Sequence, residues 1–477
     1  MSRFFVGRHD ERAGLKGLLK KKSASLVVIR GRRRIGKSRL AEEFASCFTR
    51  SYVMSGLPPE GKVTAQNQRD EFSRQMRDQG IDVNNTRDWG DLLTSVAKHC
   101  SKGRVLIVLD EITWMGDQDP TFLPKLKTVW DLHFKKNPEL ILLISGSNSM
   151  WIEKNILSST GFVGRISYRL HLKELPLHYC NEFWPGKVSL ISPFEKFKVL
   201  SVTGGVPRYL EEIRSDLTAE QNIFSLCYKP SGILFSEFDE IFSDLFANRN
   251  AIYKKITQLL VDGQLTMKDL LGKLKRPKNG DISKYLDELV EAGFLARMPS
   301  WSILKEKEER LGYYRISDNY TRFYLKYIEP YRERIASNKL RTIPRGWKSI
   351  LGLQFENLVC NNAHTLYDAI GLSDDEIVWS GPYFQAATTR QKGCQIDYLI
   401  QSKYRVLYVC EVKFSEREIP YKVVKEAESK SQRLKIPKGF SLRHVLVHVN
   451  GVAEKIEYSE AFSNVIDFSL FLNRPNG

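Results

Sequence analysis

The segment from Gly31 to Ser38 has the sequence GRRRIGKS, which places glycines, a lysine and a hydroxyl at the spacing G-x4-G-K-S. An apolar run precedes it and a segment of helical periodicity follows it. Glycines let a loop turn several backbone N–H groups toward one anion, and the next helix N-terminus adds partial positive charge. Lys37 is then placed to reach the β- and γ-phosphates of ATP, and Ser38 to hold Mg²⁺. The predicted nucleotide-binding residues are Gly31, Arg32, Arg33, Arg34, Ile35, Gly36, Lys37, Ser38 and Arg39.

Two carboxylates, Asp110 and Glu111, follow the apolar run 105–109. Such a run suits a strand that is buried on both faces, and open α/β sheets bind ligands at the carboxyl ends of their strands. We expect Asp110 to hold Mg²⁺, directly or through water, and Glu111 to polarise the attacking water as a catalytic base. Because one sheet must carry this pair and the glycine loop, the two motifs together predict ATP hydrolysis.

A third apolar run, 140–144, ends in small polar residues, of which Ser147 or Asn148 is a candidate to sense the γ-phosphate. A simple turn explains these residues nearly as well. Arg165 follows in a segment suited to a loop, and it is the candidate to stabilise charge on the transferring phosphoryl group. It would act within its own subunit or on a neighbour, and the second alternative requires a homo-oligomer.

A second set of charged residues lies in the last part of the chain. Glu356 falls in a predicted amphipathic helix, Asp397 in a predicted strand, and Glu411 and Lys413 on one face of the next strand. Asp397 and Glu411 would bind one or two Mg²⁺ ions that stabilise a pentavalent phosphate and acidify a water. Lys413 would position or deprotonate that water, or neutralise charge, and Glu356 would complete or orient the metal shell. On a following helix, Lys430 or Gln432 is a weaker candidate to assist.

The motifs GRRRIGKS, VLDE, SGSNS and GGVPRYL occur in that order. They resemble the archaeal-type ATPase family, in the signal-transducing (STAND) branch of the AAA-like P-loop NTPases. The resemblance covers roughly residues 1–245 and implies an α/β P-loop NTPase fold, with a parallel sheet and a helical lid. It also implies that Pro207, in the glycine-proline element of that lid, lies near the adenine.

The segment 251–316 has the pattern of a winged helix. Predicted helices at 251–262, 266–271 and 282–292 precede two predicted strands around a charged hairpin tip. On nucleic acid, the third helix would enter a major groove with Ser283 and Lys284 toward the bases. The alternative is a winged helix that only packs against the nucleotide domain, because Asp287, Glu288 and Glu291 on that helix would repel phosphates.

The order of a helical Glu, a strand Asp and then Glu-x-Lys resembles the PD-(D/E)xK nuclease fold, an α/β restriction-endonuclease-like domain. Archaeal-type ATPases commonly carry such a C-terminal domain. Gln395 stands where that fold often has a further carboxylate. The resemblance implies either an Mg²⁺-dependent DNA endonuclease, in a defence or mobile-element role, or a non-catalytic ATP-controlled switch whose C-terminal module only binds DNA or a protein.

The chain has 477 residues and a formal net charge of +17. Such an excess favours a polyanion such as DNA, although Lys-rich surface helices would also explain it. The seven cysteines are scattered without a C-x-x-C pair, which argues against zinc and disulfides and predicts reduced thiols in the cytoplasm. No apolar run is long enough to span a membrane. The predicted parts are a P-loop ATPase core (1–170), a helical lid (171–245), a winged helix (246–318), a basic connector (319–350) and a nuclease-like domain (351–477).

Overall fold

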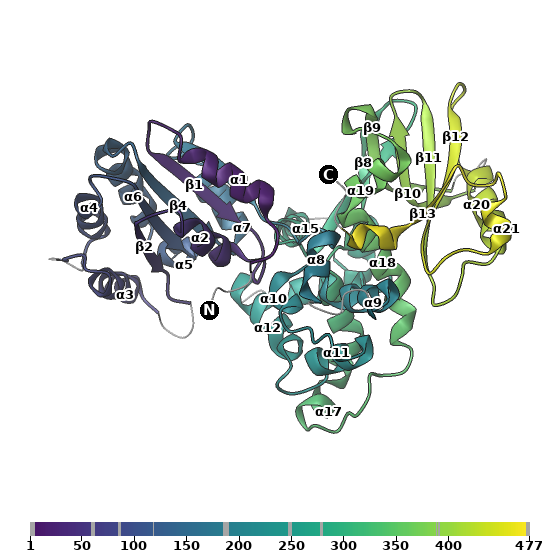
Figure 1. Cartoon of the computed structure of the whole chain (residues 1–477), viewed down its shortest axis with the longest axis horizontal. Coiled ribbons are helices and arrows are strands. Elements are labelled where there is room, and N and C mark those ends of the chain that lie inside the picture. Colours follow the sequence, from purple (N-terminus) through teal and green to yellow (C-terminus); the bar gives the residue numbers. More distant parts are fainter. Residues whose placement is uncertain are drawn as a thin grey trace. The chain divides into compact units, whose positions relative to one another are not determined.

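The computed structural model forms two compact units, residues 1–175 and 176–477 (Figure 1). The boundary between them lies close to the predicted end of the ATPase core. The structure describes residues 5–58, 63–83, 87–117, 119–184, 190–246, 250–276, 280–387, 389 and 392–473. Among these residues, no helix combines the length and the apolar character needed to cross a membrane.

The first unit is built on a five-stranded sheet in the order β2-β3-β4-β1-β5, and every neighbouring pair is parallel (Figure 1). Parallel strands need crossover connections, which here run through helices. The apolar runs predicted as buried strands are confirmed as β1, β3 and β4. The strands are β1 (Ser25–Arg30), β2 (Arg50–Ser55), β3 (Val105–Asp110), β4 (Leu140–Gly146) and β5 (Ile166–His171).

Helices cover both faces of this sheet, so each face has its own apolar core. Because side chains alternate along a strand, Val27 and Ile29 of β1 pack with α1 and α2, whereas Leu26 and Val28 belong to the core of α3, α4 and α6. The helices are α1 (His9–Leu18), α2 (Lys37–Ala45), α3 (Ala65–Asp78), α4 (Trp89–His99), α5 (Ile112–Asp117), α6 (Phe122–Leu132) and α7 (Ser149–Ile152), the last continued by a π-helical turn at Glu153–Leu157.

The second unit begins with α8, and the helices that follow it share one apolar core with the elements after them. Gly204, at φ 57°, ends α9, and Pro207 occupies the first turn of α10, so the glycine-proline element forms a bend between two helices. These helices are α8 (Leu177–Cys180), α9 (Pro193–Thr203), α10 (Pro207–Leu210), α11 (Ala219–Cys227) and α12 (Ile233–Phe246).

Three helices and a small antiparallel sheet of order β6-β8-β7 follow, close to the predicted positions. Thr266 caps the second helix, and its side chain and that of Asp269 bond to each other's backbone N–H groups. The elements are α13 (Asn250–Leu259), β6 (Leu265–Thr266), α14 (Met267–Leu274), α15 (Gly280–Glu291), β7 (Leu295–Ser302) and β8 (Lys307–Ile316).

The stretch 319–350, predicted as a basic connector, packs into the same core as α9, α10, α11 and α12. Its basic side chains alternate with buried apolar ones, among them Tyr320, Phe323 and Trp347. The Tyr320 hydroxyl donates a 2.9 Å hydrogen bond to the Leu234 carbonyl on α12. The stretch is therefore a structural part of the second unit and not a solvated linker; it contains α16 (Asn319–Phe323) and α17 (Arg332–Ala336).

The last part of the chain forms a mixed sheet in the order β13-β12-β11-β10-β9 (Figure 1). The strands β9, β10 and β11 pair antiparallel, whereas β11, β12 and β13 pair parallel. Phe355 of α18 packs on Phe414 of β11, and α20 packs on Leu446, which faces the other side. The elements are α18 (Leu351–Asn361), α19 (Ala363–Ile370), β9 (Ile377–Gln385), β10 (Cys394–Ser402), β11 (Val406–Phe414), α20 (Lys422–Arg433), β12 (Ser441–Val449), α21 (Glu454–Glu457) and β13 (Asn464–Asp467).

Candidate functional site

The glycine loop lies between β1 and α2, as its sequence context predicts. Gly31 has φ 152°, and a Cβ at that position would lie 2.6 Å from the Leu172 carbonyl oxygen, so a larger residue does not fit. Gly36 has φ 94° and caps α2, and Arg34 has φ 69°. These left-handed residues turn the loop back over the start of α2, whose first N–H groups are available to an anion.

Lys37 lies inside this loop, with its residue 5% exposed. Its ammonium donates hydrogen bonds to the carbonyls of Gly31 at 3.1 Å and Arg32 at 3.2 Å. The same nitrogen lies 3.8 Å from Oε1 of Glu111. The lysine that would contact phosphates is thus positioned by the loop backbone and by the candidate base.

Ser38 and Asp110, the two residues predicted to hold Mg²⁺, are in direct contact. The Ser38 hydroxyl donates a 2.7 Å hydrogen bond to Oδ2 of Asp110, and the Ser145 hydroxyl donates a 2.5 Å bond to Oδ1. Mg²⁺ prefers oxygen ligands and usually keeps several waters, so a hydroxyl and a carboxylate beside a phosphate loop suit it. The residues present therefore fit the ion that the motif implies.

Glu111 follows β3 in a left-handed conformation, with φ 47°. Its Oε2 accepts hydrogen bonds from the backbone N–H of Ser147 at 2.9 Å and from the Ser147 hydroxyl at 2.8 Å. Burial raises the pKa of this carboxyl, and the Lys37 charge opposes that shift. Asn148, the other predicted sensor, caps α7 by accepting from the Trp151 N–H. Of the two candidates, only Ser147 contacts Glu111 in the structure.

Arg165 lies at the amino ends of the strands, opposite the carboxyl ends where the glycine loop lies. It immediately precedes β5, and its guanidinium makes two hydrogen bonds, of 3.0 and 2.9 Å, to the carboxylate of Asp131 near the end of α6. Because β5 is parallel to β1 and has six residues, about 3.3 Å each, this end is roughly 20 Å from the carboxyl edge where the loop lies. The structure does not bring Arg165 to the phosphate loop of its own subunit, and an action on a neighbouring copy stays a prediction.

The sequence reasoning assigned no role in the loop to Arg8, which is only 6% exposed. Its guanidinium donates to the Ile35 carbonyl at 3.1 Å and to the Lys173 carbonyl at 2.6 Å, and pairs with Glu11 at 3.1 Å. Arg8 therefore ties the start of the chain and the segment after β5 to the glycine loop. The only available signal was a Gly-Arg pair just before a predicted helix.

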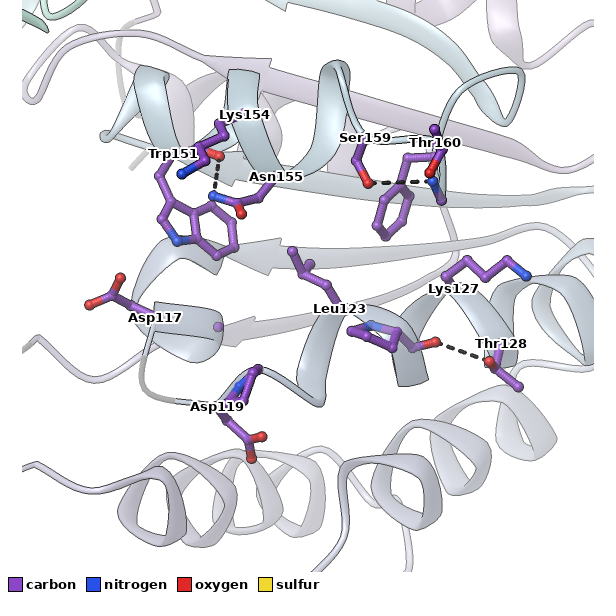
Figure 2. Close-up of a pocket in the computed structure, with 15 residues that line it drawn as sticks. Asp117, Asp119, Leu123, Lys127, Thr128, Trp151, Lys154, Asn155, Ser159 and Thr160 are labelled. Atoms are coloured by element: carbon purple, nitrogen blue, oxygen red, sulfur yellow. Dashed lines mark hydrogen bonds between the residues drawn. The ribbon is translucent and has the colours of Figure 1, made fainter. Parts of the chain in front are cut away.

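A cavity of about 830 Å³ lies between α5–α6 and the helical segment after β4 (Figure 2). Its apolar lining includes Leu123 and Trp151, and Lys127 and Asp117 are among its polar residues. None of the glycine-loop residues lines it, so this cavity is separate from the phosphate site. The predicted adenine contact, Pro207, belongs to α10 in the second unit and stays a prediction.

The C-terminal charged residues converge on one face of the mixed sheet. Asp397 on β10 lies beside Glu411 on β11, and its Oδ2 accepts a 3.0 Å hydrogen bond from the Val412 N–H. The ammonium of Lys430, from α20, lies 3.0 Å from Oδ1 of Asp397 and 2.6 Å from Oε2 of Glu411. Lys413 lies 2.6 Å from the other Glu411 oxygen. Asp397, Glu411 and Lys413 therefore lie together, as predicted. Lys430, which the sequence indicated only weakly, joins them.

Burial and charge act against each other in this cluster. Burial raises the pKa of Asp397, and the nearby Glu411 charge raises it further. Burial alone would lower the pKa of both lysines, but hydrogen bonds and charges from the carboxylates raise it instead: Glu411 and Glu426 act on Lys413, and Asp397 and Glu411 act on Lys430. Both lysines are therefore held as ammonium ions.

Glu356, on α18, lines a cavity of about 310 Å³ together with Asp397, Gln395, Arg315 and Arg322. Burial, and then the charge of Asp397, raise the pKa of Glu356 to about 7. Within the described residues, no group of three or more His, Cys, Asp or Glu side chains is arranged to hold a metal. A divalent ion at this centre would therefore have two carboxylates, Asp397 and Glu411, as its side-chain ligands.

Together, the parallel sheet, the glycine loop before α2 and the acidic pair after β3 define a P-loop ATPase domain. Residues 5–213 match the family described as an ATPase domain predominantly from Archaea. The Walker-type ATPase PABY2304 of Pyrococcus abyssi is similar in structure, with a TM-score of 0.50 and 16% identity, covering 68% of this chain and 96% of that chain. The prediction of an archaeal-type ATPase domain is thereby confirmed.

Two further comparisons extend beyond this domain. Protein MJECL04 of Methanocaldococcus jannaschii is 24% identical over 363 residues, which cover 74% of this chain and 76% of that protein. The ORC2 protein of Aeropyrum pernix, in ADPNP–ADP complexes, has a TM-score of 0.42 and 14% identity, covering 71% of this chain and 97% of that chain.

Proposed function

We propose that the first unit hydrolyses ATP, with Mg²⁺ held by Ser38 and Asp110 and with Glu111 as the base that activates water. The observation that carries this proposal is the contact of Ser38 with Asp110 at 2.7 Å, beside a Lys37–Glu111 ion pair. A hydroxyl, a carboxylate, an ammonium and a second carboxylate are the groups that phosphoryl transfer to water requires.

Different residues of this site bind the phosphates and accept the proton. The N–H groups of the loop and the start of α2 bind phosphate oxygens, and Lys37 exchanges its carbonyl partners for them. Glu111 then loses part of its pairing with Lys37 and accepts a proton from water, while Ser147 holds its other oxygen. When bound, Mg²⁺ neutralises charge on the phosphates.

Phosphate release from ATP tests this assignment, with Glu111→Gln compared to Glu139→Gln. Glu139 is an exposed carboxylate that follows α6, before β4, so its substitution controls for the loss of one charge. We expect turnover to fall only in Glu111→Gln. Equal turnover in the two variants would remove Glu111 from the mechanism.

For the second unit we propose a DNA-acting module of the PD-(D/E)xK type. Its support is the chain order α18-β9-β10-β11-α20-β12 around a mixed sheet, with Asp397, Glu411 and Lys413 on adjacent strands and Glu356 on the preceding helix. Asp397 and Glu411 would hold the metal, and Lys413 would orient or deprotonate the attacking water. The boundaries at residues 245, 318 and 350 stay predictions.

The three helices and the sheet at 250–316 would serve this module as a winged helix. On α15, Lys284 is exposed and Ser283 is half-buried, whereas Glu288 is buried and does not present its charge to a groove. Asp287 remains exposed on the same helix. Because Glu288 is buried, it does not contribute to the expected repulsion of phosphates. DNA binding by a Lys284→Ala variant distinguishes groove binding from a role in packing alone.

A further inference from the structure

We propose that Lys430 is an internal counter-cation that competes with divalent metal for the Asp397–Glu411 pair, so that metal binds there only when its ammonium withdraws. The inference rests on the metal-binding role proposed for this pair. It makes Lys430 the residue that controls metal occupancy of the C-terminal centre, and the ligand concerned is Mg²⁺ or Mn²⁺.

The geometry supports direct competition. The Lys430 nitrogen contacts one oxygen of each carboxylate, at 3.0 Å from Asp397 and 2.6 Å from Glu411. An ion that coordinates the same two oxygens, at about 2.1 Å for Mg²⁺, takes the space between them that the ammonium holds. Lys430 and such an ion therefore exclude each other.

The charges of the four side chains also favour competition between Lys430 and a divalent ion. The Asp397 and Glu411 carboxylates face two ammonium groups, Lys413 and Lys430, the first of them shared with Glu426, so the protein itself already offsets much of the charge of the pair. A divalent ion that enters beside both lysines gains little, because their repulsion offsets its attraction to the carboxylates. Once Lys430 withdraws, the two carboxylates and Lys413 leave one net negative charge for the ion.

The two lysines differ in which carboxylates they contact. Lys413 also pairs with Glu426 at 3.1 Å, and it extends from β11, the strand that carries Glu411. Lys430 is on α20, and its side chain is 28% exposed, close to the 32% of Lys413, so exposure alone does not distinguish the two lysines. A long lysine stem can swing its ammonium into solvent at modest cost. Lys430 contacts an oxygen of both Asp397 and Glu411, whereas Lys413 pairs with Glu411 and Glu426, so Lys430 is the cation that an ion bound to both carboxylates must displace.

This arrangement couples metal binding to nucleic acid. A phosphate that approaches the centre offers Lys430 another anionic partner, and the ammonium can then exchange the carboxylates for that phosphate. The vacated oxygens become available to the ion. Metal affinity at this centre should accordingly rise when a nucleic acid is bound, and this rise should depend on Lys430.

The test measures Mn²⁺ binding to the full-length protein by electron paramagnetic resonance, without ATP. The C-terminal site is defined as the Mn²⁺ binding that Asp397→Ala removes. Lys430→Met removes the ammonium and keeps the length of the side chain, and Lys425→Met changes an exposed lysine of the same helix as a control. We expect Lys430→Met to bind Mn²⁺ at least about tenfold more tightly than the wild type, because one opposing charge is removed, and Lys425→Met to match the wild type.

Equal Mn²⁺ affinity in the wild type and Lys430→Met would overturn the inference, and so would weaker binding in Lys430→Met. Because unpaired carboxylates can destabilise the fold, Lys430→Gln serves as a second variant that retains a hydrogen-bond donor. A single-stranded oligonucleotide should tighten Mn²⁺ binding in the wild type and not in Lys430→Met. The Mn²⁺ titration does not depend on cleavage. If the plasmid experiment finds no cleavage while Mn²⁺ still binds as expected, the nuclease proposal is refuted and this inference stands.

Discussion

The ammonium of Lys37 lies 3.8 Å from the carboxylate of Glu111, so the cation of the phosphate loop is paired with the candidate base. Lys37 is the first residue of α2, which follows β1, and Glu111 comes directly after β3. In the sheet, β4 lies between β1 and β3. A triphosphate competes for Lys37 and thereby changes the surroundings of Glu111. We therefore expect nucleotide binding and activation of the base to be linked through this contact.

Lys37→Ala should abolish ATP binding. The substitution removes the ammonium that would contact the β- and γ-phosphates and leaves Glu111, whose side chain is 14% exposed, without its counter-charge. Calorimetric titration with ATP–Mg²⁺ measures the loss, and Lys98→Ala, an exposed lysine on α4, is the matched control. ATP affinity within about threefold of the wild type would show that the loop is not the nucleotide site.

Glu111→Gln should trap bound ATP. The amide retains the shape of the side chain and can still accept from Ser147, but it cannot take a proton from water. General bases typically contribute about 10²- to 10⁴-fold to rate, so turnover should fall by that range while ATP binding persists. Rapid filtration with labelled ATP detects the retained triphosphate, and retention of ADP alone would contradict the assignment.

The sequence was most informative where function depends on local backbone. The glycine spacing and the flanking apolar run located the loop and β1 correctly, since a turn with Gly31 and Gly36 is determined by neighbouring residues. It was least informative about pairs that the fold brings together. Nothing near Arg165 indicates Asp131, and nothing near Lys430 indicates that it bridges Asp397 and Glu411. Such partners are selected by tertiary packing, which a periodic pattern does not encode.

The stretch 319–350 illustrates the same limit. Its basic residues are interleaved with aromatic ones, a pattern that suits a polyanion track or a solvated linker and that led to the prediction of a basic connector. The aromatic side chains Tyr320, Phe323 and Trp347 are buried in the core of the second unit. The pattern showed that apolar residues were present, but only the packing shows that they share a core with helices α9 to α12.

Arg165→Ala should leave ATP binding unchanged and lower turnover only through a neighbouring subunit. The residue is at the amino edge of the sheet, paired with Asp131, and cannot reach its own phosphate loop. Because ion pairs near the surface contribute little to stability, loss of this pair should leave the unfolding free energy nearly unchanged. If the arginine acts across an interface, mixing Arg165→Ala with Lys37→Ala should restore part of the turnover, because the first keeps an intact loop and the second keeps the arginine. No restoration at any mixing ratio would exclude that role.

DNA binding should weaken steeply as salt increases. The formal charge of +17 favours phosphate contacts, and each contact releases a counterion from the duplex. Fluorescence anisotropy with a labelled duplex, repeated at several salt concentrations, gives the slope of log affinity against log salt. Lys284→Ala should lower the affinity for DNA if α15 enters a groove. Lys425→Ala, on α20, is the control that measures how much affinity is lost when any one positive charge is removed. An affinity independent of salt would refute the polyanion interpretation.

Asp397→Ala should abolish any metal-dependent cleavage by the second unit. The substitution removes one of the two carboxylates that would hold the ion and leaves Lys430 with Glu411 alone. Supercoiled plasmid incubated with Mg²⁺ or Mn²⁺ and ATP reports nicking or linearisation on a gel, and Asp375→Ala, an exposed carboxylate before β9, is the control. Cleavage that survives Asp397→Ala would come from elsewhere. No cleavage by the wild type, combined with normal DNA binding, would favour a module that binds without cutting, under the control of the ATPase.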